Sequence, residues 1–232
     1  MSGFTARFAA VAATTAFVFF GLALPAGAQS QAQGSQVLSE STAPDVLVRT
    51  VTLEVVDILQ KDKAVRDDRK KVIALIETRV LPHFNFQAMT ASAVGRNWDK
   101  ASADQKTRLA DEFKTLLVRT YSSALSSYSN QKFDFRPLRA KLTDTDVTVN
   151  VRVLQTGAQP VTLDYDMEKR PNGWKVWDVR VGGISLVANY RTEFDNLVRE
   201  SGVDGLIKAL HSKNSSLEQP AAAAAPAGVQ KK

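Results

Sequence analysis

The sequence predicts an α+β fold in which helices precede and follow an antiparallel sheet. Apolar residues recur at helical spacing between residues 44 and 128, and again between residues 185 and 210. Between residues 147 and 181, apolar and polar residues alternate instead, which is typical of half-buried strands. Three or four strands joined by short turns, with helices on both sides in the sequence, favour such a fold.

The N-terminal part is expected to form two amphipathic helices. The first begins at Pro44, since proline is favoured in the first turn of a helix. Its apolar stripe consists of Leu47, Val48, Val51, Val55, Ile58 and Leu59. A charged stretch, residues 62–71, leads into a second helix that ends or kinks at Pro82. The apolar face of this second helix consists of Val72, Ile73, Ile76 and Val80.

Two more helices are expected before the strands. Residues 84–95 predict a short helix with a turn at Gly95. Ser102 and Gln105 form an S-x-x-Q capping box in front of the longest helix. The apolar stripe of that helix consists of Leu109, Phe113, Leu116, Leu117, Tyr121, Ala124 and Tyr128. By itself, a stripe of this kind indicates ordinary core packing.

The middle of the chain is expected to form the sheet. Two strands alternate, and their inward positions are Val147, Val149, Val151, Val153, Val161, Leu163, Tyr165 and Met167. Asn172-Gly173 predicts a tight hairpin into a third strand, residues 174–181. Residues 133–142 are a weaker candidate for an edge strand, because Pro137 lies within them.

The C-terminal part returns to helical spacing. A helix is expected to open at Gly183 or Ser185 and to close at Gly202, and Asp204 can cap a last short helix. We expect one folded domain over residues 44–213, which is long enough for a substantial core. Residues 29–43 then form a flexible leader and residues 214–232 a disordered tail rich in Ala and Pro.

Residues 1–28 have the pattern of a secretory signal peptide. Arg7 precedes an apolar run over residues 8–24, and Ala26-Gly27-Ala28 supplies a small-residue cleavage site. A retained membrane anchor is the alternative, which the small residues and the polar stretch after them disfavour. We therefore expect an exported protein that is soluble after cleavage.

Charge and cysteine content exclude several classes of function. The formal net charge is +6, and removal of residues 1–28 takes away Arg7 and no acid, which leaves +5. Basic and acidic residues are interleaved without the basic, aromatic-rich block of a nucleic-acid-binding surface, so we expect no nucleic-acid partner. The chain contains no cysteine, which excludes disulfides, thiol catalysis and thiolate metal sites.

The sequence also lacks the usual signatures of catalysis and metal binding. His83 and His211 are the only histidines, and neither lies in a cluster with metal-ligand spacing. No serine lies in a G-x-S-x-G elbow, and Gly182-Gly183 is too short for a dinucleotide or phosphate loop. We therefore expect no metal, no cofactor and no catalytic residues.

One enzymatic alternative stays open. Helices packed against a curved antiparallel sheet can enclose a pocket in which a carboxylate acts as a general base. Asp178 is the candidate for such a base, because strict alternation places it on the same face as Trp174. A structural hydrogen bond from Asp178 to an indole or a backbone amide is the favoured interpretation. A third possibility is an interaction protein with a filled core, since periodicity cannot distinguish a filled core from a lined cavity.

Three segments resemble one known family in the same order. They read AMTASAVGRNWDKASADQKTRLADEFKTLLVRTYSSAL (Ala88–Leu125), GWKVWDVRVGGISLVANYRTEF (Gly173–Phe194) and GVDGLIKAL (Gly202–Leu210). These segments resemble the MlaC family, also called toluene-tolerance periplasmic proteins, and the resemblance covers about residues 44–213. It implies an NTF2-like curved sheet packed with a helical subdomain, enclosing an apolar cavity for phospholipid acyl chains.

The resemblance also implies a function and partners. Such proteins carry phospholipid between an outer-membrane Mla lipoprotein complex and the MCE-domain protein of an inner-membrane Mla ABC transporter, and thereby maintain the lipid asymmetry of the outer membrane. We expect a monomer. The residues expected to line the lipid cavity are Met89, Val94, Phe113, Leu117, Tyr121, Val149, Val151, Val153, Leu163, Tyr165, Trp174, Val176, Ile184, Val187 and Phe194.

Overall fold

The computed structural model describes residues 40–126, 131–141 and 143–218. Helix α1 (Pro44–Lys61) begins with proline in its first turn, as expected. The charged stretch that follows forms two short helices, α2 (Lys63–Arg66) and α3 (Arg69–Leu75). Asp62 and Asp68 cap them, because each carboxylate accepts a hydrogen bond from a backbone amide of the first turn.

The segment after α3 changes its helical geometry twice. A π-helical turn, η1 (Ile76–Val80), is followed by a 3₁₀ turn, η2 (Leu81–His83). The Thr78 hydroxyl donates to the carbonyl of Ala74 at 2.8 Å, which competes with the backbone ladder at this point. Since Pro82 has no amide hydrogen, the α-helix expected up to this residue is replaced by two different turns.

Two helices follow as expected. Asn85 caps α4 (Phe86–Val94), and its side-chain oxygen accepts from the Ala88 amide at 3.1 Å. After α4 the chain turns at Gly95, which has φ +60° and opens a 3₁₀ turn, η3 (Gly95–Asn97). The capping box in front of α5 (Ala103–Ser126) is confirmed. The Ser102 amide donates to Gln105 Oε1 at 2.9 Å, and the Gln105 amide donates to Ser102 Oγ at 3.2 Å.

The sheet has five strands in sequence order, each antiparallel to its neighbours. They are β1 (Lys132–Phe135), β2 (Asp146–Leu154), β3 (Val161–Arg170), β4 (Gly173–Val181) and β5 (Ile184–Ser185). Strand β1 is the edge strand and ends before Pro137, as expected for a residue that cannot donate to the ladder. The hairpin between β3 and β4 turns at Pro171 and Asn172, and Gly173 opens β4 with φ +94°.

Helix α6 (Leu186–Glu218) is interrupted at Gly202, which has φ +72°. The expected closure of the helix at this glycine is therefore a kink, after which the helix continues. The helix also extends beyond Lys213, where we expected the domain to end, and Asn214 is buried. The side-chain amide nitrogen of Asn214 donates to Glu112 Oε2 at 2.6 Å, and this hydrogen bond connects the last part of α6 to α5.

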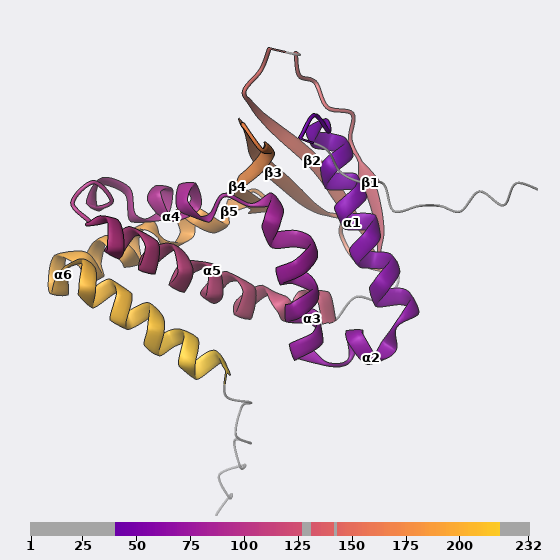
Figure 1. Ribbon diagram of the computed structural model, residues 1–232. Helices are drawn as coiled ribbons and strands as arrows, with labels where there is room; N and C mark the ends of the chain where they lie inside the picture. Colours follow the sequence, from indigo (N-terminus) through magenta and orange to yellow (C-terminus); the bar gives the residue numbers. More distant parts are fainter. Residues whose placement is uncertain (1–39, 127–130, 142, 219–232) are drawn as a thin grey trace, which may run out of the picture. The chain divides into compact units, whose positions relative to one another are not determined.

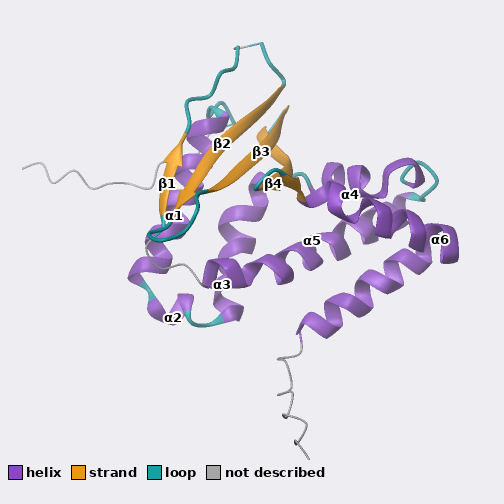
Figure 2. Ribbon diagram, turned by 180° about the vertical axis from the view of Figure 1, so that it is seen from behind, coloured by secondary structure: helices purple, strands orange, loops and turns teal. Residues whose placement is uncertain are grey.

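Three apolar clusters hold these elements together. The first joins α4, α5 and α6, the second joins α1 to one face of the sheet, and the third joins α1, α3, η1 and α5. In Figure 1, α1 lies along the sheet while α4, α5 and α6 gather to one side of it. Figure 2 shows β1, β2 and β3 in front of α1, so α1 covers a single face of these strands.

The opposite face of the sheet is polar. Asp166 accepts from Thr148 Oγ1 at 2.6 Å and forms an ion pair with Arg180 at 3.0 Å. Asn150 donates to Asp164 at 2.7 Å across the same two strands. The predicted alternation of β2 and β3 is therefore confirmed, except that Val161 at the start of β3 is 43% exposed. The α+β fold class is also confirmed.

A β-bulge in β4 changes the position of Asp178. Asp166 pairs with Asp178 but Met167 pairs with Val176, so Trp177 is an extra residue in the ladder. Strict alternation placed Asp178 on the face of Trp174, and this was wrong because the bulge reverses the faces after Trp177. Asp178 lies on the polar face and is only 6% exposed.

Asp178 joins the sheet to the start of α6. Its carboxylate accepts from Ser185 Oγ at 2.5 Å, from the Val179 amide at 2.8 Å and from the Val187 amide at 3.2 Å. A backbone amide was one of the partners expected for this residue. Its role here is to cap α6 and to fix the turn after β4.

We predict that Asp178→Ala lowers the free energy of unfolding by about 2–4 kcal/mol, because buried donors lose their acceptor. Urea unfolding followed by circular dichroism measures this. Asp146→Ala, at an exposed position in β2, is the control and should change stability by less than about 0.5 kcal/mol. Equal stability of the Asp178→Ala variant and the unsubstituted protein would contradict the capping role.

Candidate functional site

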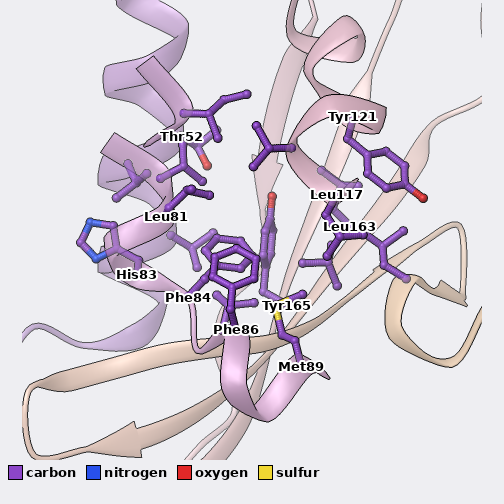
Figure 3. A pocket seen from close by; sticks show the side chains of 18 of the residues that line it. Thr52, Leu81, His83, Phe84, Phe86, Met89, Leu117, Tyr121, Leu163 and Tyr165 are labelled. Atoms are coloured by element: carbon purple, nitrogen blue, oxygen red, sulfur yellow. The ribbon is translucent and has the colours of Figure 1, made fainter. Parts of the chain in front are cut away.

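An apolar cavity of about 300 Å³ lies where the helices meet the sheet (Figure 3). Its walls come from α1, η1, η2, α4, α5, β3, β4 and the first residue of α6. The apolar lining residues are Leu47, Val48, Val51, Ile76, Val80, Leu81, Phe84, Phe86, Met89, Leu117, Val118, Leu163, Met167, Val176, Val179, Val181 and Leu186. The remaining lining residues are Thr52, His83, Tyr121, Ser122 and Tyr165.

The cavity carries no charge at neutral pH on the lining residues that the structure describes. Burial lowers the pKa of His83 below its usual value, and the nearby positive charge of Lys175 lowers it further, with Glu54 acting in the opposite direction. The imidazole is therefore neutral at pH 7. Burial raises the pKa of Tyr165 to about 12, so its hydroxyl also stays neutral. A site of this kind accepts an apolar ligand and excludes a charged one.

The bulge in β4 builds one wall of the cavity. Val176 lies before the extra residue, while Val179 and Val181 lie after it, yet all three line the cavity. Strict alternation placed Val176 on the opposite face from Val179 and Val181. The bulge brings them to the same face, so β4 presents a longer apolar surface than its sequence pattern indicates.

The segment between η2 and α4 runs alongside β4 and forms the adjacent wall. Phe84 makes a parallel bridge to Val176, and the Asn85 amide donates to the Val176 carbonyl at 2.8 Å. The rings of Phe84 and Phe86 are stacked with their centroids 5.8 Å apart. Figure 3 shows these two rings beside Tyr165, with His83 and Tyr121 on opposite sides of the cavity.

Six residues that the sequence indicated for a lipid cavity lie in this lining: Met89, Leu117, Tyr121, Leu163, Tyr165 and Val176. They come from α4, α5, β3 and β4, so the structure brings together residues far apart in the sequence. Their contact with a ligand remains a prediction.

The other nine residues lie outside the cavity lining. Val94, Phe113, Val187 and Phe194 belong to the cluster between α4, α5 and α6. The Phe113 ring packs edge-on against Tyr190 and Phe194, with centroids 5.2 and 5.3 Å away, which fills the space between these helices. Helical periodicity identified these positions as buried but could not distinguish a filled interface from a cavity wall.

The other five residues outside the cavity lining belong to strands β2, β4 and β5. Val149 and Val151 are buried in the cluster that joins α1 to the sheet. Trp174 is partly buried beside that cluster, and Val153 lies near the end of β2 opposite Val161. Ile184 directly follows the Gly182-Gly183 turn, is 66% exposed and lies outside the cavity lining.

Sequence reasoning missed the contribution of the segments before α4. Leu47, Val48, Val51 and Thr52 of α1 line the cavity, as do residues from η1 and η2. The apolar faces of the first two helices were expected, but none of their residues was expected to line the cavity. The one local signal was Pro82, which ends a regular helix and thereby places Leu81, His83 and Phe84 at the cavity.

The described part of the chain contains neither a metal-ligand cluster nor a membrane-spanning helix. Over residues 40–218, apart from 127–130 and 142, no group of three His, Asp or Glu side chains lies close enough to hold a metal ion. Within the same described part of the chain, no helix combines the length and apolar character needed to cross a bilayer. Residues 1–39, with the expected signal peptide and most of the leader, lie outside the described residues. Residues 219–232 of the expected tail, and Tyr128, also lie outside them.

The chain is similar to several known proteins. It is 22% identical over 178 residues to the intermembrane phospholipid transport system binding protein MlaC of Haemophilus influenzae, covering 75% of this chain and 83% of the relative. It is 29% identical over 105 residues to the toluene tolerance protein ttg2D of Pseudomonas putida, covering 45% of this chain and 48% of that protein.

A solved structure is also similar. It is a phospholipid-binding protein from Ralstonia solanacearum in complex with a phospholipid, with 36% sequence identity and a TM-score of 0.72. The match covers 77% of this chain and 100% of that one. The family described as MlaC protein matches residues 49–212. This range includes every strand of the sheet and all of the helices that line the cavity except the first residues of α1 and the last residues of α6. The chain therefore belongs to the MlaC family.

Proposed function

We propose that this protein is a periplasmic carrier that moves phospholipid between the outer membrane and an inner-membrane ABC transporter, and so maintains outer-membrane lipid asymmetry. The observation that carries the proposal is the uncharged apolar cavity between the sheet and the helices. The names of the relatives from Haemophilus and Ralstonia support phospholipid as the ligand. The expected signal peptide supports the periplasmic location.

The size of the cavity supports a chain-like ligand. An acyl chain spans one leaflet, or about 15 Å, and carbon contact distances give it a radius of about 2 Å, so its volume is roughly 200 Å³. The cavity of about 300 Å³ is therefore large enough for one chain and for part of a second. Complete burial of both chains requires its walls to move apart.

The energetics explain why such a carrier needs partners. Each buried methylene contributes about 0.8 kcal/mol, so a lipid held by two chains leaves the protein slowly into water. Transfer from the cavity into a bilayer exchanges one apolar environment for another and is much less unfavourable. We therefore propose that loading and release occur at the MCE-domain protein of the transporter and at the outer-membrane lipoprotein complex, with the carrier acting as a monomer.

The enzymatic alternative has little support. Asp178, the carboxylate considered as a base, caps α6 on the polar face of the sheet and does not line the cavity. The residues that do line the cavity include no carboxylate among those described. A general base must lie within hydrogen-bond reach of its substrate, and Asp178 does not meet this requirement for a ligand in the cavity.

We predict that the protein purified from a bacterial periplasm contains about one phospholipid molecule per chain. Native mass spectrometry, followed by organic extraction and lipid analysis, measures this content. A protein that is free of lipid, and that stays free after incubation with phospholipid vesicles, would contradict the proposed function.

A variant that fills the cavity should lose lipid while staying folded. Leu163→Trp adds a large side chain to the lining and should displace at least two methylenes, which corresponds to more than about a tenfold loss of affinity. Ile184→Trp is the matched control, because Ile184 is exposed outside the cavity. Lipid content per chain and thermal unfolding should be measured for both. A loss of lipid in the control alone would show that the cavity is not the binding site.

A further inference from the structure

A second hollow of about 560 Å³ adjoins the cavity. It lies between the β3–β4 turn, the segment from η2 into α4, and α5, and it shares Leu81, Phe84 and Phe86 with the cavity lining. Three cations line it, namely Lys114, Arg170 and Lys175, and we term this hollow the basic groove. Leu81, Phe84 and Phe86 therefore separate the uncharged cavity from the positively charged groove, and a ligand that occupies both must extend past these side chains.

The lysines of the basic groove have hydrogen-bond donors that can still bind a ligand. Lys114 is paired with Asp111 at 2.9 Å, and Lys175 donates to the Pro82 carbonyl at 2.7 Å. Each of these contacts uses one of the three donors of an ammonium group. Arg170 is paired with Glu168 at 2.7 Å, a residue outside the groove lining. Among the described lining residues, three cations face one anion, which leaves an excess of two positive charges, or of one when Glu168 is counted.

The phosphate of a phospholipid requires a positively charged site at the edge of an apolar cavity. It carries a negative charge, and an isolated charge is strongly unfavourable in an apolar cavity without partners. Phosphate oxygens form strong, charge-assisted hydrogen bonds with lysine and arginine. The phosphate of a lipid held in the cavity should therefore lie at an edge where cations are available.

Another charged hollow borders the cavity but fits less well. It lies between α3 and α5 and shares Leu81 and Val118 with the cavity. Its Arg69 donates to the carbonyls of Leu217 and Arg119, and its Arg119 donates to the Asn214 carbonyl and to Glu218. These guanidinium groups hold the helices together through their hydrogen bonds. In the whole lining, four cations face three carboxylates, which leaves an excess of one positive charge.

We propose that the basic groove binds the phosphate of the phospholipid whose acyl chains occupy the cavity. This inference rests on the proposed lipid-carrier function and assigns its head-group site. In this arrangement the glycerol lies beside Phe84 and Phe86, and Lys114 and Lys175 contact the phosphate from α5 and β4. The groove would then select lipids that carry a phosphate over uncharged lipids with the same chains.

The test compares phosphatidylglycerol with diacylglycerol of identical acyl chains. The delipidated protein is incubated with vesicles that contain both lipids, and its bound lipid is measured by native mass spectrometry. The unsubstituted protein should prefer phosphatidylglycerol by at least about tenfold, and Lys114→Glu/Lys175→Glu should abolish this preference. Diacylglycerol binding should be unchanged in that variant, which also shows that the cavity is intact.

Lys63→Glu/Lys208→Glu is the control, because it changes the net charge equally at exposed positions outside the groove. Its lipid preference should equal that of the unsubstituted protein. An unchanged preference in the groove variant, or equal losses of both lipids, would overturn the proposal. Binding of neither lipid by the unsubstituted protein would overturn the carrier function itself. Titration with inorganic phosphate tests the source of the ligand, and saturation of the groove by phosphate without any effect on lipid preference would overturn the head-group assignment.

Discussion

Asn85 connects the start of α4 to the sheet through hydrogen bonds. Its amide donates to the Val176 carbonyl at 2.8 Å, and its side chain both caps α4 and donates to Glu168 at 2.5 Å. Asp178 makes the second attachment, from the other face of β4 to the start of α6. Because both attachments are polar, they set the distance between α4, α6 and β4 without requiring the apolar side chains between them to meet. The cavity is the space that this distance leaves.

This arrangement explains why the protein has three apolar clusters around a cavity instead of one continuous core. Helix α5 contributes Phe113 and Leu117 to one cluster and Val118 to another, and both Leu117 and Val118 also line the cavity. Filling the cavity would increase the buried apolar contact within the protein, so leaving it open lowers stability. A ligand with long apolar chains restores that contact. On our proposal, the phospholipid completes the core while it is carried.

Much of the fold could be predicted from the sequence, because local signals agreed with the final structure. The capping box at Ser102 and Gln105, the alternation in β2 and β3, and the helix break at Pro82 all depend on neighbouring residues. The site was less predictable. Alternation and helical periodicity do not predict the bulge at Trp177 or the π-helical geometry after Leu75, and each changes which side chains face the cavity. Periodicity marked Phe113, Phe194 and Val151 as buried, but burial against a neighbouring element and burial against a ligand have the same pattern in a sequence.

The central claim is that acyl chains lie in the cavity bounded by α1, η1, η2, α4, α5, β3 and β4. The most direct measurement is photo-crosslinking with a phospholipid that carries a diazirine near the end of one chain, followed by mass spectrometry of the modified peptides. We predict adducts on residues 47–52, 76–89, 117–122 and 163–181. Adducts confined to the interface of α5 with the part of α6 after Gly202 would contradict it, because that interface is filled by side chains.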